Sequence, residues 1–264
     1  MQPGNPVGWM VVVLGVFLSI FGCDPCEHPL KTRSSKPEIL LYVGETMADV
    51  ITDLAGIFEK REHAVVKMIT GGSGFLKDAI ELNRIGDIFF PGNKKYFNDF
   101  SDPGIIGQVN TVGYNEAVLF VARGNPKKIV NIPEDLLRED ISIAIGSPHS
   151  GSIGRETARI LHRLDIHSAI IRKAVFLAVD SKLLTNRLLS RDVDVIINWK
   201  ATGYTKKTKG WISPVPLPGQ VGQKQPLAMA RLSFSRHPDL ADKFMALAVS
   251  DQGRELFKQY GFRD

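Results

Sequence analysis

Apolar residues recur along this chain at two spacings, one typical of buried strands and one typical of helices that cover a sheet. The run Ile39–Val43 is short, apolar and partly β-branched, and it predicts a strand. In the next stretch, Thr46–Lys60, the apolar side chains of Val50, Leu54 and Phe58 fall on one face of a helix. This alternation predicts an α/β fold.

The same strand-and-helix unit then repeats. Ala64–Ile69 and Asp87–Phe90 have the pattern of strands, and Phe75–Asn83 between them has the pattern of a helix. Strands that are separated by single helices favour parallel pairing with a helical crossover. The first part of the chain therefore predicts a parallel sheet.

A second group of strands and helices begins in the middle of the chain and predicts a second lobe. Its predicted strands are Ala117–Ala122, Ile141–Ile145 and Val193–Asn198, and its predicted helices are Arg155–Leu164 and Lys182–Leu189. Gly210–Gln225 is rich in Pro and Gly and is predicted as surface loops, before a final helix over Pro238–Ser250.

The N-terminus carries a targeting signal. Val11–Phe21 is an apolar run too short to span a bilayer, and it stops at Gly22 and Cys23. This pattern resembles a bacterial lipoprotein signal, in which Cys23 is lipid-modified and becomes the first mature residue. Glu27–Pro37, rich in Lys, Ser and Pro, then forms a tether. An uncleaved anchor and plain secretion are the alternatives.

Composition and charge exclude several classes of function. The chain has 264 residues, of which 44% are hydrophobic and 23% charged, and a net charge of +5, all typical of a globular protein. Its basic residues are not interleaved with aromatic ones as in a nucleic-acid groove, so we expect no nucleic-acid partner. Cys23 and Cys26 are the only cysteines, and beside a membrane segment they do not predict a redox pair.

The sequence lacks the motifs of a catalytic or metal centre. None of the six histidines has the spacing of a metal site or of a nucleophile-and-base pair. The glycine-rich stretch that begins at Gly71 lacks the Gly-Lys-Ser/Thr of a nucleotide phosphate loop. We therefore expect no enzymatic activity, no metal site and no cofactor.

Three loops share one physical property, which is a small or hydroxyl residue between a strand and the start of a helix. They are Gly44–Thr46, Gly71–Gly74 and Ser150–Gly154. Free backbone N–H groups and the helix dipole make such helix ends natural anion sites, and the glycines allow close backbone approach. The alternative for each loop is that its hydroxyl is an ordinary N-cap. Three such loops together favour an anion site.

The order and spacing of these pieces resemble the molybdate-binding proteins of bacterial ABC importers over about Ile39–Phe262. The matching pieces are Tyr42–Val50, Gly72–Gly74, Gly86–Phe89, Gly154–Arg155, Asp192–Ile196, and Ser250–Arg254 through Tyr260–Phe262. The resemblance implies a two-lobed α/β periplasmic-binding-protein fold of type II, with the ligand cleft between the lobes. Lobe 1 then spans residues 38–112 and 226–264, and lobe 2 spans residues 113–225. They follow a signal segment, residues 1–23, and a tether, residues 24–37.

The resemblance also implies which residues hold the ligand. Proteins of this family bind the oxyanion with hydroxyls, backbone amides and one tyrosine hydroxyl. By spacing, the hydroxyl positions fall on Thr46 and Ser73, and the backbone-donor positions on Ile153 and Ser181. The tyrosine position falls on Trp199, whose indole donates one N–H and cannot accept. The alternative for Trp199 is an aromatic residue of the hinge core.

A second departure from the family is Glu45, which stands where the family has a small neutral residue. A carboxylate beside the site repels a dianion unless it is turned away, protonated, or accepting from a protonated ligand. Donors alone select a fully deprotonated oxyanion such as molybdate, tungstate or sulfate. Phosphate keeps a proton, for which Glu45 or Asp180 would be the acceptor.

Together these features predict the extracytoplasmic solute-binding component of an ABC importer. We expect a monomer, held on the outward face of a membrane by its lipid anchor, that captures a small inorganic tetrahedral oxyanion, molybdate or tungstate, for the permease subunits. Sulfate or a phosphate-like anion is the alternative ligand. The alternative roles are a sensory binding module that feeds a signalling partner and a transferase on the same fold.

Overall fold

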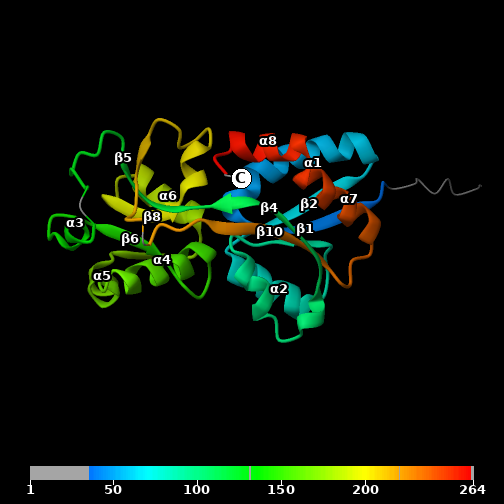
Figure 1. The fold of residues 1–264 in the computed structure, drawn as a ribbon, viewed down its shortest axis with the longest axis horizontal. Helices are drawn as coiled ribbons and strands as arrows, with labels where there is room; N and C mark the ends of the chain where they lie inside the picture. The colour runs from blue at the N-terminus through cyan, green and yellow to red at the C-terminus, as the bar shows by residue number, and fades with distance from the viewer. Residues whose placement is uncertain (1–35, 131, 220, 263–264) are drawn as a thin grey trace, which may run out of the picture. The chain divides into compact units, whose positions relative to one another are not determined.

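The computed structural model describes residues 36–130, 132–219 and 221–262. Two five-stranded sheets, each covered by helices, make up this part of the chain (Figure 1). Their strand orders are β2-β1-β3-β10-β4 and β7-β6-β8-β5-β9, and both are mixed sheets. The predicted α/β class with two lobes is confirmed. The signal segment with Cys23 and all of the tether except Lys36 and Pro37 lie outside the described residues.

The first lobe, as the name is used below, is the sheet β2-β1-β3-β10-β4 with its helices. Its strands are β1 (Glu38–Gly44), β2 (Val65–Gly71), β3 (Ile88–Phe90), β4 (Ile106–Asn115) and β10 (Gln225–Leu232). Its helices are η1 (Glu45–Met47), α1 (Ala48–Glu62), α2 (Ser73–Asn83), η2 (Lys94–Asp99), η3 (Pro103–Ile105), α7 (Pro238–Val249) and α8 (Asp251–Gln259).

Strand β1 lies inside the first sheet and sets the position of two of the glycine loops. It pairs in parallel with β2 from Glu38 opposite Val65 to Gly44 opposite Gly71. Both strands therefore end at the same edge, and the residues that follow them meet there. On one side of the sheet α1 and α7 pack together, with the rings of Phe58 and Phe244 edge to face at 5.2 Å.

The second lobe is the sheet β7-β6-β8-β5-β9 with its helices. Its strands are β5 (Ala117–Ala122), β6 (Ile143–Gly146), β7 (Phe176–Ala178), β8 (Val195–Trp199) and β9 (Ile212–Val215), and its helices are α3 (Glu134–Leu137), α4 (Ser152–Arg163), α5 (His167–Lys173), α6 (Ser181–Leu189) and η4 (Lys200–Tyr204). Strand β6 is parallel to β7 and β8. The carboxyl ends of these strands therefore lead into α4, α6 and η4 at one edge.

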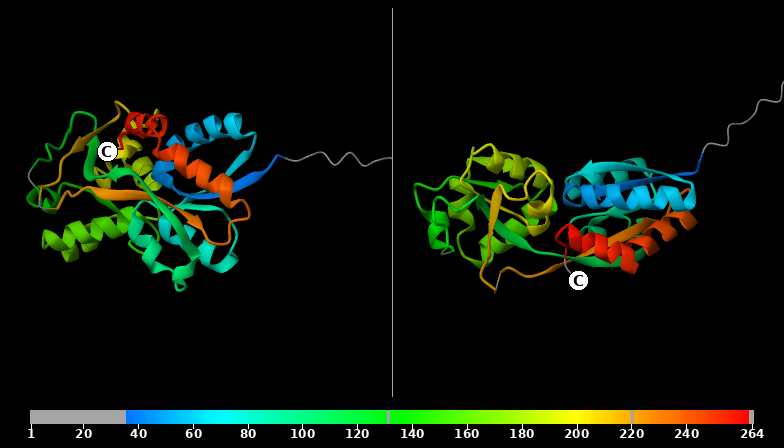
Figure 2. Two further views of the ribbon diagram at one scale, coloured as in Figure 1. Left: turned by 45° about the vertical axis from the view of Figure 1, so that its right-hand side comes forward. Right: turned by 90° about the horizontal axis from the view of Figure 1, so that it is seen from above.

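The chain crosses between the two sheets twice, and the two crossings run side by side (Figures 1 and 2). Strand β4 leads into β5, and the chain returns through β9 and β10. Asn115 at the end of β4 pairs with Gln225 at the start of β10. Two adjacent extended segments are thus the covalent link between the lobes, which suits a hinge. The lobe boundaries at residues 112 and 225 stay a prediction.

Four strands, β4, β7, β9 and β10, depart from the sequence-based expectation, because none of them was predicted. Strand β4 was not predicted because most of its side chains are exposed or half-buried, so its apolar pattern is weak. Strand β9, Ile212–Val215, lies inside the segment predicted as loops, and that prediction is wrong here. Pro214 has no N–H to donate, but β9 is an edge strand, where proline is tolerated.

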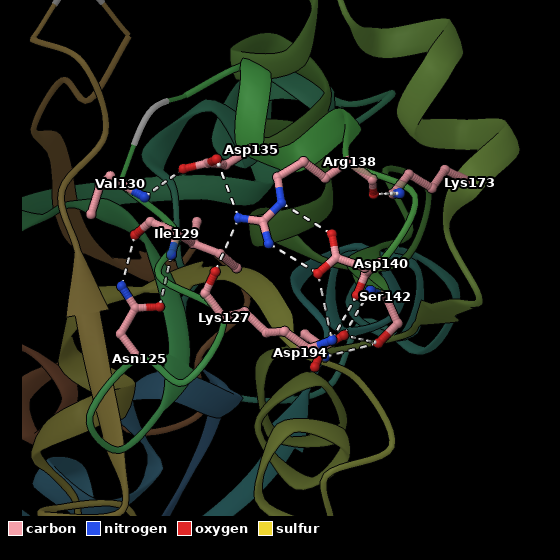
Figure 3. A network of polar contacts seen from close by, with 10 residues as sticks. All are labelled: Asn125, Lys127, Ile129, Val130, Asp135, Arg138, Asp140, Ser142, Lys173 and Asp194. Atoms are coloured by element: carbon pink, nitrogen blue, oxygen red, sulfur yellow. Dashed lines mark hydrogen bonds and ion pairs between the residues drawn. The ribbon is translucent and has the colours of Figure 1, made fainter.

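A polar network outside the three glycine loops holds the segment between β5 and β6 in place (Figure 3). Arg138 donates from Nε and Nη2 to Asp140 at 3.0 and 2.9 Å, and from Nη1 to the carbonyl of Lys127 at 3.0 Å. Asp194 accepts from both the backbone N–H and the hydroxyl of Ser142. The hydrogen bond to Asp140 raises the pKa of Arg138. This network is structural, because none of these residues lines the pocket described next.

Candidate functional site

A small pocket lies where the strand ends of the two lobes meet. Its volume is about 10 Å³, close to the space that one water-sized molecule needs. The first lobe contributes residues from three loops and the second from two. The lining residues are Gly44, Glu45, Thr46, Gly71, Gly72, Ser73, Gly92, Gly151, Ser152, Ile153, Asp180 and Ser181. A pocket of this size and composition suits a small ion.

Two serine hydroxyls in the pocket receive hydrogen bonds from protein donors. The backbone N–H of Gly92 donates to Ser73 Oγ at 3.0 Å. The indole Nε1–H of Trp199 donates to Ser152 Oγ at 3.1 Å. Each hydroxyl has one proton, and in both the oxygen already serves as an acceptor. Each serine therefore keeps its own O–H to donate to a molecule in the pocket.

Ser181 repeats this pattern from a third helix. Thr46 Oγ1 donates to Ser181 Oγ at 2.9 Å, across the gap between the lobes. Ser181 is the first residue of α6, as Ser73 is of α2 and Ser152 is of α4. Three helix starts thus each present a serine O–H to one pocket.

The helix ends supply backbone donors as well. The N-caps of α2 and α4 are Gly72 and Gly151, and neither provides a side-chain acceptor for the first turn. Ile153, second in α4, lines the pocket. In α6 the Asp180 carboxylate caps the helix by accepting from Leu183 N at 2.8 Å. An anion in the pocket would supply acceptors at the two helix ends that glycine leaves without one.

The hydroxyls are not the N-caps that the alternative interpretation required. Thr46 lies inside η1, and Ser73 and Ser152 each follow a glycine N-cap. Ser150, in the same loop as Ser152, donates instead to the carbonyl of Val179 at 2.9 Å and does not line the pocket. The structure therefore separates the two serines of that loop into a pocket residue and a structural one.

The two lobes meet at backbone distance beside the pocket. Gly74 N donates to the Ser150 carbonyl at 2.9 Å. A Cβ on Gly72 would lie 2.4 Å from Ser150 O and 2.7 Å from Val179 O, and a Cβ on Gly92 would lie 2.2 Å from the Ser152 hydroxyl. Any side chain at Gly72 would therefore push the lobes apart, because its neighbours there are backbone atoms.

Glu45 is paired in the structure. Its Oε1 lies 3.0 Å from Nζ of Lys182 on α6, and the Glu45 side chain is 12% exposed against 64% for Lys182. The hydrogen bond that Lys182 donates to the Glu45 carboxylate raises the pKa of Lys182. The carboxylate that departs from the family pattern thus has a cationic partner from the opposite lobe, which the sequence reasoning did not identify.

A second contact between the lobes lies at Arg155 on α4. Its guanidinium forms an ion pair with Asp99 and stacks over the ring of Tyr96 at 3.9 Å. Burial raises the pKa of Tyr96 to about 12. Both partners come from η2, so α2, α4, α6 and η2 are all held near the pocket by contacts across the cleft.

The structure brings four of the five predicted ligand residues together. Thr46, Ser73, Ile153 and Ser181 all line the pocket. Trp199 is fully buried behind it and reaches it only through the Ser152 hydroxyl. The sequence reasoning missed the hydroxyl of Ser152, although its loop had been singled out, and it missed Lys182, because no local pattern signals a partner from another lobe. Cys23 lies outside the described residues.

No group of three or more His, Cys, Asp or Glu side chains in the described part of the chain could hold a metal ion. No helix among the same residues is long and apolar enough to cross a membrane.

Comparison with known proteins gives consistent matches. The family model for bacterial extracellular solute-binding proteins matches residues 39–263. The molybdate-binding protein ModA of Mycobacterium tuberculosis is 24% identical over 241 residues, which cover 90% of this chain and 89% of that protein.

Solved structures show the same architecture. The periplasmic molybdate-binding protein of Azotobacter vinelandii has a TM-score of 0.73 at 17% identity, covering 85% of this chain and 98% of that one. The sulfate-binding protein SubI of Mycobacterium tuberculosis has a TM-score of 0.73 at 17% identity, covering 86% of each chain. At these identities the likeness shows the fold. The resemblance to molybdate-binding proteins and the predicted periplasmic-binding-protein fold are confirmed.

We expect Gly72→Ala to hold the lobes apart without unfolding either one. The φ and ψ of Gly72, −66° and 133°, suit alanine, so the clash is entirely with Ser150 and Val179 of the other lobe. Small-angle X-ray scattering should give a larger radius of gyration than for the wild type, with an unchanged circular dichroism spectrum.

The matched control is Gly56→Ala in α1, where an added Cβ meets no atom within 4 Å. It should raise stability by about 0.5–1 kcal/mol, because alanine is the better helix former, and leave the scattering unchanged. Identical scattering from Gly72→Ala and the wild type would disprove the close approach at Gly72.

The Glu45–Lys182 pair predicts a pH effect in the alkaline range. The pKa of Lys182 is raised in the folded protein, so the stabilisation is fully present below the ordinary lysine pKa of about 10.4 and is lost as the pH rises through the raised value. Glu45→Gln should lower the Lys182 pKa toward the ordinary value in an NMR titration. The pKa of Lys77, which its hydrogen bond to Glu81 raises, should be the same in both proteins. An unchanged Lys182 pKa would show that the pair does not form in solution.

Proposed function

This chain belongs to the family of bacterial extracellular solute-binding proteins, and we propose that it captures a dianionic tetrahedral oxyanion for the permease subunits of an ABC importer. Molybdate and tungstate are the first ligands to test, because relatives in sequence and in fold are named as molybdate-binding proteins. The role is binding and delivery rather than catalysis.

One observation carries the proposal, namely the direction of the hydrogen bonds at Ser73, Ser152 and Ser181. All three oxygens already accept from the protein, so their protons are available as donors. Molybdate, tungstate and sulfate at neutral pH present only acceptors. Donors without charge, together with two helix N-termini, complement such a ligand. The backbone N–H of Ile153 completes the proposed ligand set, and Thr46, whose one proton goes to Ser181, supports that serine from behind.

The role of Trp199 in this proposal is indirect. Its indole N–H orients Ser152 rather than touching the ligand. A buried tryptophan at this position can therefore support an oxyanion site without the acceptor capacity of a phenol.

The carboxylates of Glu45 and Asp180 make a monoprotonated oxyanion, such as hydrogen phosphate, the second candidate ligand. Both line the pocket, and either carboxylate could accept the ligand's proton. Lys182 cancels the charge of Glu45, and Asp180 already accepts from Leu183. These bonds favour the deprotonated ligands, and calorimetry with both classes decides between them.

Ligand binding would be coupled to closure of the lobes. The bonds Thr46–Ser181, Gly74–Ser150 and Glu45–Lys182 all join one lobe to the other at the pocket. A closed form stabilised by ligand is what permease subunits would recognise. A signalling partner could read the same form. The neighbouring genes separate the two roles, because permease and ATPase genes there would indicate import and a kinase gene would indicate signalling.

We expect Ser73→Ala to weaken oxyanion binding by about 1.5–3 kcal/mol, the range for a hydrogen bond to a charged group. Titration calorimetry with molybdate, tungstate, sulfate and phosphate measures it. The substitution also removes the acceptor of the buried Gly92 N–H. An unsatisfied buried donor lowers the free energy of unfolding by about 1–3 kcal/mol, and urea unfolding measures this loss separately.

Ser150→Ala is the control, because it also removes one serine hydroxyl from a loop beside the pocket. The Ser150 hydroxyl donates to the Val179 carbonyl, and Ser150 does not line the pocket. The oxyanion affinity of this variant should match the wild type. Equal affinities of Ser73→Ala and wild type would remove Ser73 from the site.

We also propose that Cys23 is acylated and anchors the protein on the outward face of the membrane as a monomer. A lipid chain there would keep the binding protein near its importer. Cys23→Ser should abolish metabolic labelling with palmitate and release the protein from the membrane fraction. A wild type that takes up no label and fractionates as soluble would contradict the anchor.

A further inference from the structure

A larger cavity of about 150 Å³ lies beside the small pocket. Glu45, Thr46 and Ser181 line both spaces. These shared residues make two contacts across the cleft, the 2.9 Å bond from Thr46 to Ser181 and the 3.0 Å ion pair of Glu45 with Lys182. A tetrahedral group in the small pocket would therefore lie next to a space that an inorganic ion leaves empty.

The walls of the larger cavity suit a short organic group with one polar end. Thr185, Thr202 and Thr208 line it, but each donates its hydroxyl to a backbone carbonyl, at 2.8, 2.7 and 2.7 Å. The protons of these hydroxyls are therefore used within the protein. Lys207 and Asn186 add an ammonium and an amide to the same lining, and Asp49 adds a carboxylate.

The donor set of the small pocket matches a phosphate ester better than inorganic phosphate. A phosphomonoester ends in three acceptor oxygens, and its second pKa near about 6 leaves it without a proton at pH 7. Three acceptor oxygens correspond to the three O–H donors of Ser73, Ser152 and Ser181. The fourth oxygen of the tetrahedron is then the bridge to the organic group.

We propose that this site binds small organic phosphates, with the phosphoryl group in the small pocket and the organic part in the larger cavity, directed there past Thr46 and Ser181. The proposal rests on the proposed function in one respect, that the small pocket holds a tetrahedral oxyanion. Lys207 then pairs with a carboxylate or binds a hydroxyl of the organic part.

Titration calorimetry of the mature protein with four probes tests it. The probes are molybdate, inorganic phosphate, methyl phosphate and phosphoglycolate, which carries a carboxylate. Phosphoglycolate should bind at least about tenfold more tightly than inorganic phosphate, a difference of about 1.4 kcal/mol, and more tightly than methyl phosphate.

Two variants alter the larger cavity alone. Ala48→Leu narrows it at the first residue of α1, and Lys207→Met removes its ammonium. Each should lower the ratio of phosphoglycolate to molybdate affinity by about tenfold, Ala48→Leu because it fills space for the organic part and Lys207→Met because it removes one charged contact. The matched controls are Ala246→Leu, which lines a separate cavity on α7, and Lys206→Met, next to Lys207 but outside the cavity lining. Neither should change the ratio.

The outcomes separate this proposal from the one on which it rests. Tight phosphoglycolate binding whose ratio falls in both cavity variants, but in neither control, supports it. If molybdate binds and phosphoglycolate binds no more tightly than inorganic phosphate, or if Ala48→Leu and Ala246→Leu give equal ratios, the organic-phosphate proposal is wrong and oxyanion capture stands. If no probe binds, both are wrong.

Discussion

The candidate site depends on the fact that a serine hydroxyl has one proton to donate. In a pocket built for anions, that proton must point at the ligand rather than at the protein. The structure meets this requirement three times by placing a donor behind each hydroxyl, namely a backbone N–H at Ser73, an indole N–H at Ser152 and a threonine hydroxyl at Ser181. Because the oxygens are already accepting, the pocket is directed toward an acceptor-only ligand.

The arrangement also requires backbone segments of two lobes to approach each other closely. Parallel pairing brings the ends of β1 and β2 to one edge of the first sheet, and the same geometry brings α4 and α6 to an edge of the second. The glycines at these ends let the loops meet without side chains between them, as Gly72 and Gly92 show. These glycines keep the pocket small, and a methyl group added at Gly72 or Gly92 would therefore prevent the lobes from closing.

Charge at the pocket is balanced across the cleft rather than excluded from it. Glu45 would oppose a dianion, but its partner Lys182 belongs to the other lobe. The pair can form only where the lobes meet, so neutralisation of Glu45 and closure are one event. Both residues of this pair also line the larger cavity. The contact that neutralises Glu45 is thus shared with the space proposed for an organic group.

The sequence by itself determined the α/β class and most strands and helices, because these follow from local periodicity. Four residues that line the pocket, namely Thr46, Ser73, Ile153 and Ser181, were assigned from the spacing of motifs that resemble those of molybdate-binding proteins. The sequence did not reveal β4, β7 and β9, whose edge positions demand little apolar pattern, nor the interior strand β10. Only the tertiary structure decided that Trp199 donates to Ser152 and that Lys182 pairs with Glu45. These bonds join residues 47 and 137 positions apart, and the direction of a hydrogen bond between such residues depends on how the elements pack rather than on their own sequence.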